Sequence, residues 1–251
     1  IETTPTNIID GQPGLTHLQT ALKNGKHAIT SNKGPLAIAL PSLMQLAHHN
    51  HVQLRFSGTV GGGTPFLEFA KRCLEGDKIL SITGILNGTT NYILSRMSEE
   101  KISFETALSE AQKAGYAEAN PSMDIDGLDS AAKLVILANW ILGLRVTLKD
   151  VNIKGVRDIK LDEIENALSQ NCKLKLIAHA NGNLKVTPQL IEREHPLCVD
   201  GVLNAVSFKS KYAGEETLIG RGAGGIETAS AILRDLISIK HAITMKNKME
   251  W

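Results

Sequence analysis

Apolar positions in the first 57 residues alternate between helical and strand spacing. Leu15, Leu18 and Leu22 lie three or four residues apart and predict a helix that ends near Gly25. A strand, an apolar helix and a second strand are then predicted at residues 27–30, 35–48 and 52–56. Pro41 predicts a break in the second helix. Helices that alternate with short strands are typical of a parallel sheet covered by helices.

The pattern changes at residue 58, where a glycine-rich loop leads into a predicted helix at residues 65–76. Three more helices are expected at residues 89–98, 103–114 and 127–142, and beyond residue 148 the chain is β-rich. The predicted strands occupy residues 78–86, 173–180, 184–191, 202–208 and 216–219. Asn181-Gly182-Asn183 has the composition of a hairpin turn. A second glycine cluster, residues 220–225, opens a last helix that runs to about residue 239.

Composition excludes several classes of protein. The 251 residues are 42% hydrophobic and 21% charged, which is ordinary for a globular chain. The net charge of +1 and the 4% of aromatic residues argue against a nucleic-acid surface. No apolar run approaches the roughly 20 residues of a membrane span. Three cysteines without a CxxC pair argue against a disulfide framework or zinc site, so we expect a cytoplasmic protein.

The densest cluster of chemical groups lies between residues 115 and 133. It holds four carboxylates and one lysine, namely Glu118, Asp124, Asp126, Asp129 and Lys133. Asp129 and Lys133 are four residues apart, so they share a helix face. A solvent-exposed ion pair is the usual interpretation of such a spacing. Here the same helix is otherwise apolar, so we expect the pair at the edge of the core, where a lysine can donate a proton.

Two other segments are candidates for binding. Residues 84–92 form a strand–turn–helix junction whose free N–H groups could bind a carboxylate, or whose Thr89 could simply cap the helix. Lys33 follows a predicted parallel strand, at the end where open α/β sheets bind ligands. Both interpretations of the junction remain open.

Several other features carry less weight. The glycine loops at residues 61–63 and 220–225 are more often tight turns than phosphate cradles. The histidines at residues 48, 49 and 51 are explained by the end of a helix better than by a metal. Cys73 lies on an apolar predicted helix and is expected in the core.

Taken together, these segments resemble the homoserine dehydrogenase family. The resemblance extends from about residue 3 to 239 and includes residues 84–94 and the segment from Gly220 to Ala229. Its most specific part is the family signature between residues 111 and 133. The matching positions are Ala111, Gly115, Tyr116, Asn120, Pro121, Asp124, Ile125, Gly127, Asp129 and Lys133.

The resemblance implies an NAD(P)-dependent interconversion of L-aspartate 4-semialdehyde and L-homoserine, in threonine and methionine biosynthesis. It makes Lys133 the proton donor, with Lys33 as a second candidate. The implied substrate-binding residues are Glu118, Asp124, Asp129, Gly88 and Thr89, with Glu118 holding the amino group. The implied cofactor-binding residues are Thr4, Pro5, Ser31, Lys33, Gly115, Gly222, Ala223 and Gly224.

A sodium ion is a further expectation from the family. Its ligands would be the backbone carbonyls of Val60, Gly62 and Thr64. Members with a defined cation site often carry a glutamate where this chain has Ser57. One anionic ligand is therefore missing.

We expect an α/β fold with a partial Rossmann-like parallel sheet and an α+β catalytic domain. Residues 1–57 would belong to the dinucleotide-binding domain, residues 58–212 to the catalytic and dimerisation domain, and residues 213–251 would return to the first. Antiparallel strands that need a second sheet to cover them favour a homodimer. The family's GxGxxG segment would lie upstream of Ile1, so we expect the chain to begin within a domain, and the choice between NAD and NADP stays open.

Two alternatives remain at this stage. The chain could be a non-catalytic substrate-binding or dimerisation module of the same fold. It could also be a related dehydrogenase that acts on a different amino-acid aldehyde. Turnover of homoserine would exclude the non-catalytic module.

Overall fold

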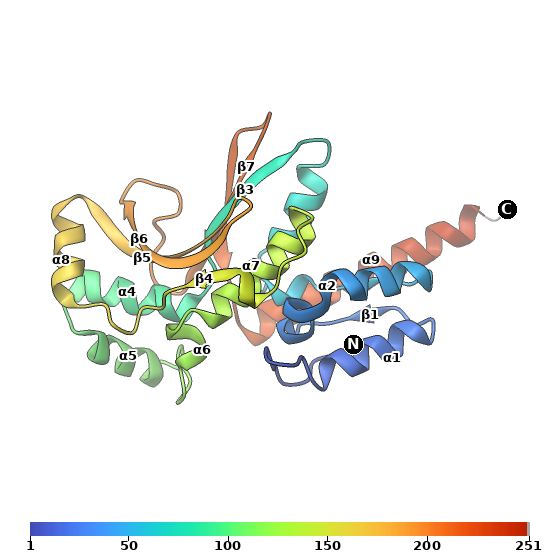
Figure 1. The fold of residues 1–251 in the computed structure, drawn as a ribbon, viewed down its shortest axis with the longest axis horizontal. Coiled ribbons are helices and arrows are strands. Elements are labelled where there is room, and N and C mark those ends of the chain that lie inside the picture. Colours follow the sequence, from blue (N-terminus) through green and yellow to red (C-terminus); the bar gives the residue numbers. More distant parts are fainter. Residues whose placement is uncertain (250–251) are drawn as a thin grey trace.

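A short parallel sheet organises the N-terminal part of the protein. The computed structural model describes the backbone of residues 1–249 and the side chains of residues 1–244. β1 (Ala28–Ile29) pairs in parallel with β2 (Leu54–Arg55), and Glu2 adds a parallel bridge to Thr30. α1 (Gly14–Lys23) and α2 (Lys33–His49) pack against each other beside these strands (Figure 1). The predicted parallel α/β arrangement is confirmed.

The last helix returns to this N-terminal part. α9 (Gly225–Met249) packs against β1 and against the 3-10 turn η1 (Ser57–Thr59) that follows β2 (Figure 1). Ser57 and Asp235 join the two elements, because the Ser57 backbone N–H donates to the Asp235 carboxylate at 2.8 Å. The N-terminal strands and α9, which are far apart in the sequence, therefore pack together.

α2 bends where the sequence predicts a break. Ala39 has φ −137° and ψ 19°, outside the helical region, and Pro41 follows two residues later. Proline has no N–H to donate and its ring crowds the preceding turn, so a helix kinks there. The kinked part of α2 faces the segment that follows α7, since Ala39, Pro41 and Arg145 line one cavity.

A six-stranded sheet forms the other part. Its strand order is β4-β6-β5-β3-β7-β8, and only β4 and β6 run parallel. The predicted hairpin is confirmed, with Ala180 opposite Leu184 at its tip. The strands are β3 (Ile79–Ile85), β4 (Val151–Ile153), β5 (Cys172–Ala180), β6 (Leu184–Glu192), β7 (Leu203–Ser210) and β8 (Glu215–Arg221).

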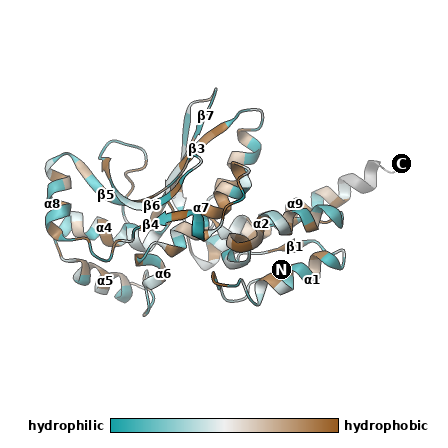
Figure 2. Ribbon diagram, in the orientation of Figure 1, coloured by the Kyte–Doolittle hydropathy of each residue, from teal (hydrophilic) through white to brown (hydrophobic). Residues whose placement is uncertain are grey.

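α7 (Leu128–Ile141) is the helix that connects the two parts. It packs against α2 on one side and against β5 on the other, and its residues 129–138 are all buried. Figure 2 shows hydrophobic residues along α7 and α2. The remaining helices are α3 (Phe66–Glu68), α4 (Gly88–Glu100), α5 (Phe104–Lys113), α6 (Ser122–Ile125) and α8 (Leu161–Ser169), with η2 (Phe69–Cys73) and η3 (Leu148–Asp150) as single turns.

Three expectations about elements were wrong. The single helix at residues 65–76 is instead the one-turn helix α3 followed by the π-helical turn η2. Cys73 ends that turn and is exposed rather than part of the core, because the chain there faces solvent. The stretch beyond residue 148 also contains a helix, α8, which covers β5. No helix in the described part of the chain is long and apolar enough to cross a bilayer.

Candidate functional site

The carboxylate of Asp129 lies between the ammonium groups of two lysines. Its Oδ2 is 2.7 Å from Lys133 Nζ, and its Oδ1 is 3.1 Å from Lys33 Nζ. Asp129 and Lys133 are 5% and 8% exposed, so this cluster is largely desolvated. The structure confirms that the Asp129–Lys133 pair lies at the edge of the core.

Three elements bring these side chains together. Gly127 has φ 84°, a conformation that favours glycine, and this lets the chain turn from α6 into α7. Lys133 lies one turn after Asp129, and its Nζ also donates to the Leu86 carbonyl just beyond β3 at 2.8 Å. Lys33 is the first residue of α2. The site therefore depends on β3, α2 and α7 meeting at one point.

Asn87 connects the two acidic residues of the site. Its Nδ2 donates to Asp124 at 2.6 Å and to Asp129 at 2.8 Å. Its Oδ1 accepts the backbone N–H of Thr90 at 2.8 Å, so Asn87 is also the N-cap of α4. Of the two interpretations left open for this junction, capping by Thr89 is excluded, because Thr89 lies inside α4 and donates its hydroxyl to the Tyr116 carbonyl at 2.7 Å.

Burial and neighbouring charge act in opposite directions on the two acids. Burial by itself raises the pKa of Asp129, but the ammonium groups of Lys133 and Lys33 outweigh it and keep that pKa well below its ordinary value. Burial also raises the pKa of Asp124, and the charge of Asp129 raises it further. Asp129 therefore loses its proton more readily than a free aspartate, whereas Asp124 holds its proton more readily.

Two cavities open on either side of this cluster. One has a volume of about 540 Å³ and the other about 800 Å³. Four of the predicted site residues line both cavities, namely Lys33, Glu118, Asp124 and Asp129. The candidate site is therefore the region where the two cavities meet.

The smaller cavity includes the start of α4. Gly88, Thr89 and Lys133 all line it. The first N–H groups of a helix have no partner within the helix, so this end of α4 can bind an anion. The structure thus brings Gly88 and Thr89 together with the acidic and basic groups.

The predicted cofactor residues fall into two groups. Pro5 lines the larger cavity, and Lys33, Gly115, Ala223 and Gly224 line the smaller one. Thr4, Ser31 and Gly222 do not line either cavity. The Thr4 hydroxyl donates to Glu2 at 2.5 Å, Ser31 lies against Gly58, and Gly222 lies against Asn204.

Sequence reasoning did not assign roles to several residues that line the smaller cavity. These residues are Asn87, Tyr116, Ala117, Val202, Arg221 and Glu227. Tyr116 belongs to the signature, and its ring lies 4.9 Å from that of Tyr92. An Asn between a strand and a helix signals a cap, but nothing in the local sequence signals that Asn87 reaches two carboxylates.

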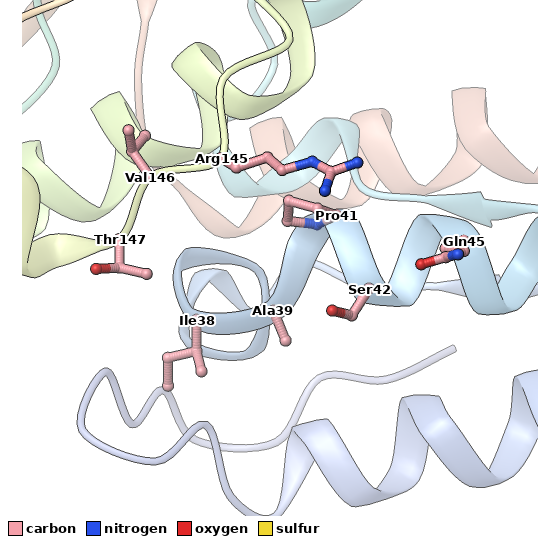
Figure 3. Close-up of a pocket in the computed structure, with 8 residues that line it drawn as sticks. All are labelled: Ile38, Ala39, Pro41, Ser42, Gln45, Arg145, Val146 and Thr147. Atoms are coloured by element: carbon pink, nitrogen blue, oxygen red, sulfur yellow. The ribbon is translucent and has the colours of Figure 1, made fainter.

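A third cavity, of about 520 Å³, lies away from this site. Figure 3 shows it between the kink of α2 and the segment after α7, lined by Pro41, Gln45 and Arg145 among others. None of the predicted catalytic, substrate-binding or cofactor-binding residues lines it. We therefore assign it no role in the chemistry.

The expected sodium ligands lie in the loop between η1 and α3. The Thr64 carbonyl already accepts the Phe66 N–H at 2.9 Å, and Arg234 Nη1 lies 3.3 Å from the Gly63 carbonyl. The Ser57 hydroxyl is held by Asp235 at 2.5 Å and by Glu68. The guanidinium group of Arg234, which reaches this loop from α9, is a poor neighbour for a sodium ion. No step of the reaction is therefore assigned to a sodium ion. Among the described residues no three His, Cys, Asp or Glu side chains form a metal cluster.

The fold and the site define an α/β protein with a pocket in which carboxylates and ammonium groups lie side by side. Comparison with known proteins identifies the family. Residues 65–237 match the family model described as homoserine dehydrogenase. The homoserine dehydrogenase of Methanocaldococcus jannaschii is 48% identical over 240 residues, which cover 95% of this chain and 71% of that protein. An NAD(+)-dependent homoserine dehydrogenase of Pseudomonas canavaninivorans is 42% identical, over 98% of this chain and 72% of that protein.

Solved structures agree with this assignment. A putative homoserine dehydrogenase from Archaeoglobus fulgidus superimposes with a TM-score of 0.90 at 46% identity, covering 95% of this chain and 73% of that one. A hyperthermophilic archaeal homoserine dehydrogenase in complex with NADPH gives 0.82 at 32% identity, covering 91% and 68%. The chain belongs to the homoserine dehydrogenase family, whose members are oxidoreductases.

Proposed function

We propose that the protein interconverts L-aspartate 4-semialdehyde and L-homoserine with NAD(P)H or NAD(P)+, a step toward threonine and methionine. The observation that carries this proposal is the buried Lys133–Asp129–Lys33 cluster, which lies where two cavities meet. The matches to family members over nearly the whole chain support it.

The pocket offers complementary groups to both charged ends of an amino acid. The carboxylate of Glu118 makes no hydrogen bond with any described residue, so it is free to accept a substrate ammonium group, with Asp124 beside it in the lining of both cavities. The backbone N–H groups at the start of α4, at Gly88 and Thr89, can donate hydrogen bonds to the substrate carboxylate. This arrangement orients the side chain of the substrate toward Lys133.

Lys133 is the proposed proton donor. Reduction of the aldehyde builds negative charge on its oxygen, and an ammonium group stabilises that charge and supplies the proton. Asp129 holds Lys133 in place through an ion pair of 2.7 Å and supplies the counter-charge of its ammonium group in a largely desolvated site. Lys33 contacts the same carboxylate and is the second candidate for the proton transfer.

A nicotinamide cofactor fits the cavity lining. Gly115 lines the smaller cavity, and a β-carbon at that position would meet nothing within 4 Å, so no described side chain or backbone blocks an approach to it there. Ala223 and Gly224 line the same cavity. When bound, the cofactor supplies or accepts the hydride. One relative carries NADPH and another is named NAD(+)-dependent, so both forms are candidates here.

We also propose a cytoplasmic homodimer. The three cysteines are free, as expected in a reducing compartment. Across five strands of the large sheet, cross-strand partners form a polar row consisting of Thr217, Ser207, Thr83, His179 and Lys185. Lys185 is exposed, Ser207 is buried, and the other three side chains are half-buried. A second copy of the sheet is the cover that this face fits.

Turnover of homoserine tests the proposed function. The protein is incubated with L-homoserine and either NAD+ or NADP+, and formation of the reduced cofactor is followed by its absorbance. We expect Lys133→Met to lower kcat by about 100-fold or more, because the proton donor is lost. The matched control is Lys209→Met, an exposed lysine on β7, which should retain parental kcat.

The other outcomes separate the alternatives. Binding of homoserine without turnover by the parent protein would favour a non-catalytic module. Turnover of a different amino-acid aldehyde in preference to L-aspartate 4-semialdehyde would favour a related dehydrogenase. Unchanged kcat in Lys133→Met would remove Lys133 as the donor and leave Lys33.

A further inference from the structure

Asn204 is a buried amide that makes no hydrogen bond with any described residue. It lies on β7, is 1% exposed, and both its Nδ2 and its Oδ1 lack partners among the described residues. Buried polar groups are nearly always paired, since an unpaired group loses its water without compensation. An amide left in this state needs an explanation.

The location of Asn204 suggests that explanation. Its carboxamide lies against the Cα of Gly222, where a β-carbon would overlap it. The next two residues, Ala223 and Gly224, line the smaller cavity of the candidate site. Asn204 therefore lies directly behind the turn that forms one wall of that cavity.

The turn itself has unused hydrogen-bonding groups. The peptide groups of Gly222 and Ala223 make no hydrogen bond with any described residue, whereas Gly224 accepts the Thr228 N–H at 2.9 Å. Unpaired peptide groups and an unpaired carboxamide are thus neighbours. Each offers a donor and an acceptor that suit the other.

Glycine gives this turn the freedom to change conformation. Gly222 and Gly224 flank Ala223, and Gly224 has φ 135°, which few other residues adopt. The backbone of Gly222 also lies close to Gly62, where a β-carbon would be 3.0 Å from the Gly222 carbonyl carbon. Because neither glycine carries a side chain, a rotation of this turn would bring its peptide groups to the edge of the Asn204 amide.

We propose that Asn204 is a positioning residue of the cofactor site, and that its amide pairs with the Gly222–Gly224 turn when a nicotinamide cofactor fills the smaller cavity. This inference rests on the proposed function. Part of the binding free energy would come from satisfying the buried amide. The bound state would then hold the turn in one conformation.

The test compares Asn204→Leu with Asn91→Leu. Asn91 is equally buried at 1% exposed, but it is fully paired, donating to the Val199 and Leu203 carbonyls and accepting from Lys175. Melting temperatures are measured without ligand and with NADH or NADPH, and kcat and KM are measured for cofactor and homoserine.

In the absence of ligand, Asn204→Leu is expected to melt at or above the parental temperature, since it removes an unpaired amide. Asn91→Leu is expected to melt about 4 °C lower or more, since it leaves several groups unpaired. With cofactor, Asn204→Leu should lose most of the cofactor-induced rise in melting temperature. Its cofactor KM should increase about tenfold while homoserine KM stays within about twofold.

Asn204→Ala provides a second variant if leucine does not fit beside Gly222, and the same pattern is expected of it. A drop in ligand-free melting temperature with a full cofactor-induced rise would show a purely structural role and overturn the proposal. If the parent protein itself shows no cofactor-induced rise and no turnover, the proposed function fails, and this inference fails with it.

Discussion

At the residue scale, Asp129 has the largest electrostatic role in the site. One carboxylate balances two ammonium groups, at 2.7 Å and 3.1 Å. Asp129→Asn would leave Lys133 largely desolvated without a counter-charge. We expect this to lower the free energy of unfolding by about 3 kcal/mol and kcat by about 100-fold.

The matched control for Asp129 is Asp126, three residues earlier. Asp126 pairs with Arg157 at 2.9 Å, but both side chains are exposed. Asp126→Asn should change the free energy of unfolding by less than about 1 kcal/mol. Urea unfolding of both variants measures the difference. Equal effects of the two substitutions would contradict the central role of Asp129.

Asp124 gives a pH-dependent prediction at the same scale. Burial and the charge of Asp129 raise its pKa above the ordinary value of 3.8. A carboxyl with a raised pKa stabilises the fold fully below its unfolded pKa, and that contribution is lost as pH rises through the folded pKa. Asp124→Asn, which cannot ionise, should therefore gain stability relative to the parent as pH rises.

Thermal melts of the parent and of Asp124→Asn at pH values from about 4 to 7 check this difference. The gap between the two melting temperatures should widen in favour of the variant toward pH 7. A gap that stays constant over this range would show that Asp124 does not titrate there.

The sequence predicted interactions between residues that are close along the chain. It did not predict hydrogen bonds between residues that only the tertiary structure brings together. Asp129 and Lys133 are one helical turn apart, so their spacing alone predicted the pair. Asn87 reaches Asp124 and Asp129 only because β3 ends beside α6 and α7. Cys73 was misplaced because its apolar neighbours suggested a regular helix that the chain does not form.

At the element scale, the N-terminus of α4 combines a cap with part of the site. Asn87 caps the helix and bridges two carboxylates at once. Asn87→Ala should cost about 1 kcal/mol of stability for the cap, and it should raise homoserine KM by about tenfold, because Asp124 and Asp129 lose the donor between them.

Ser103→Ala is the matched control for this cap. Ser103 caps α5 by accepting the Thr106 N–H at 3.3 Å, and it does not line either cavity of the candidate site. Its loss should cost a similar amount of stability and leave homoserine KM unchanged. A parallel rise in KM in both variants would mean that KM follows stability rather than the geometry of the site.

The elements that were missed are short or stabilised from a distance. β4 has three residues, and its pairing comes from β6, with Val151 opposite Leu184. α8 is nine residues long, and its buried positions, Ile164 and Ala167, are few. Longer periodic segments such as α7 and the β5–β6 hairpin were predicted, because their pattern persists over several turns or pairs.

At the scale of the whole molecule, the site gathers segments that are far apart in the sequence. Lys33, Gly88, Asp129 and Gly224 all line one cavity. Spacing and periodicity could not place them together, and only the family resemblance led to that expectation. A contact between distant segments also holds α9 in place. Its Asp235 accepts hydrogen bonds from the backbone N–H and the hydroxyl of Ser57, which follows β2.

The open face of the large sheet gives the last prediction. Thr83 lies at the centre of the polar row, is half-buried, and its hydroxyl is 2.8 Å from His179 Nδ1. Burial, followed by the charge of Lys185, lowers the pKa of His179, which therefore stays neutral near pH 7. A face with little charge at its centre can pack against a second copy of itself.

Thr83→Lys would place a charge at that centre. Light scattering during gel filtration should show a dimer for the parent and a monomer for this variant, because two like charges would meet across the two-fold axis. Thr106→Lys, on the exposed surface of α5, should remain dimeric. Circular dichroism checks that both variants keep their secondary structure. A parent that is monomeric, or a Thr83→Lys variant that stays dimeric, would show that this face is not the interface.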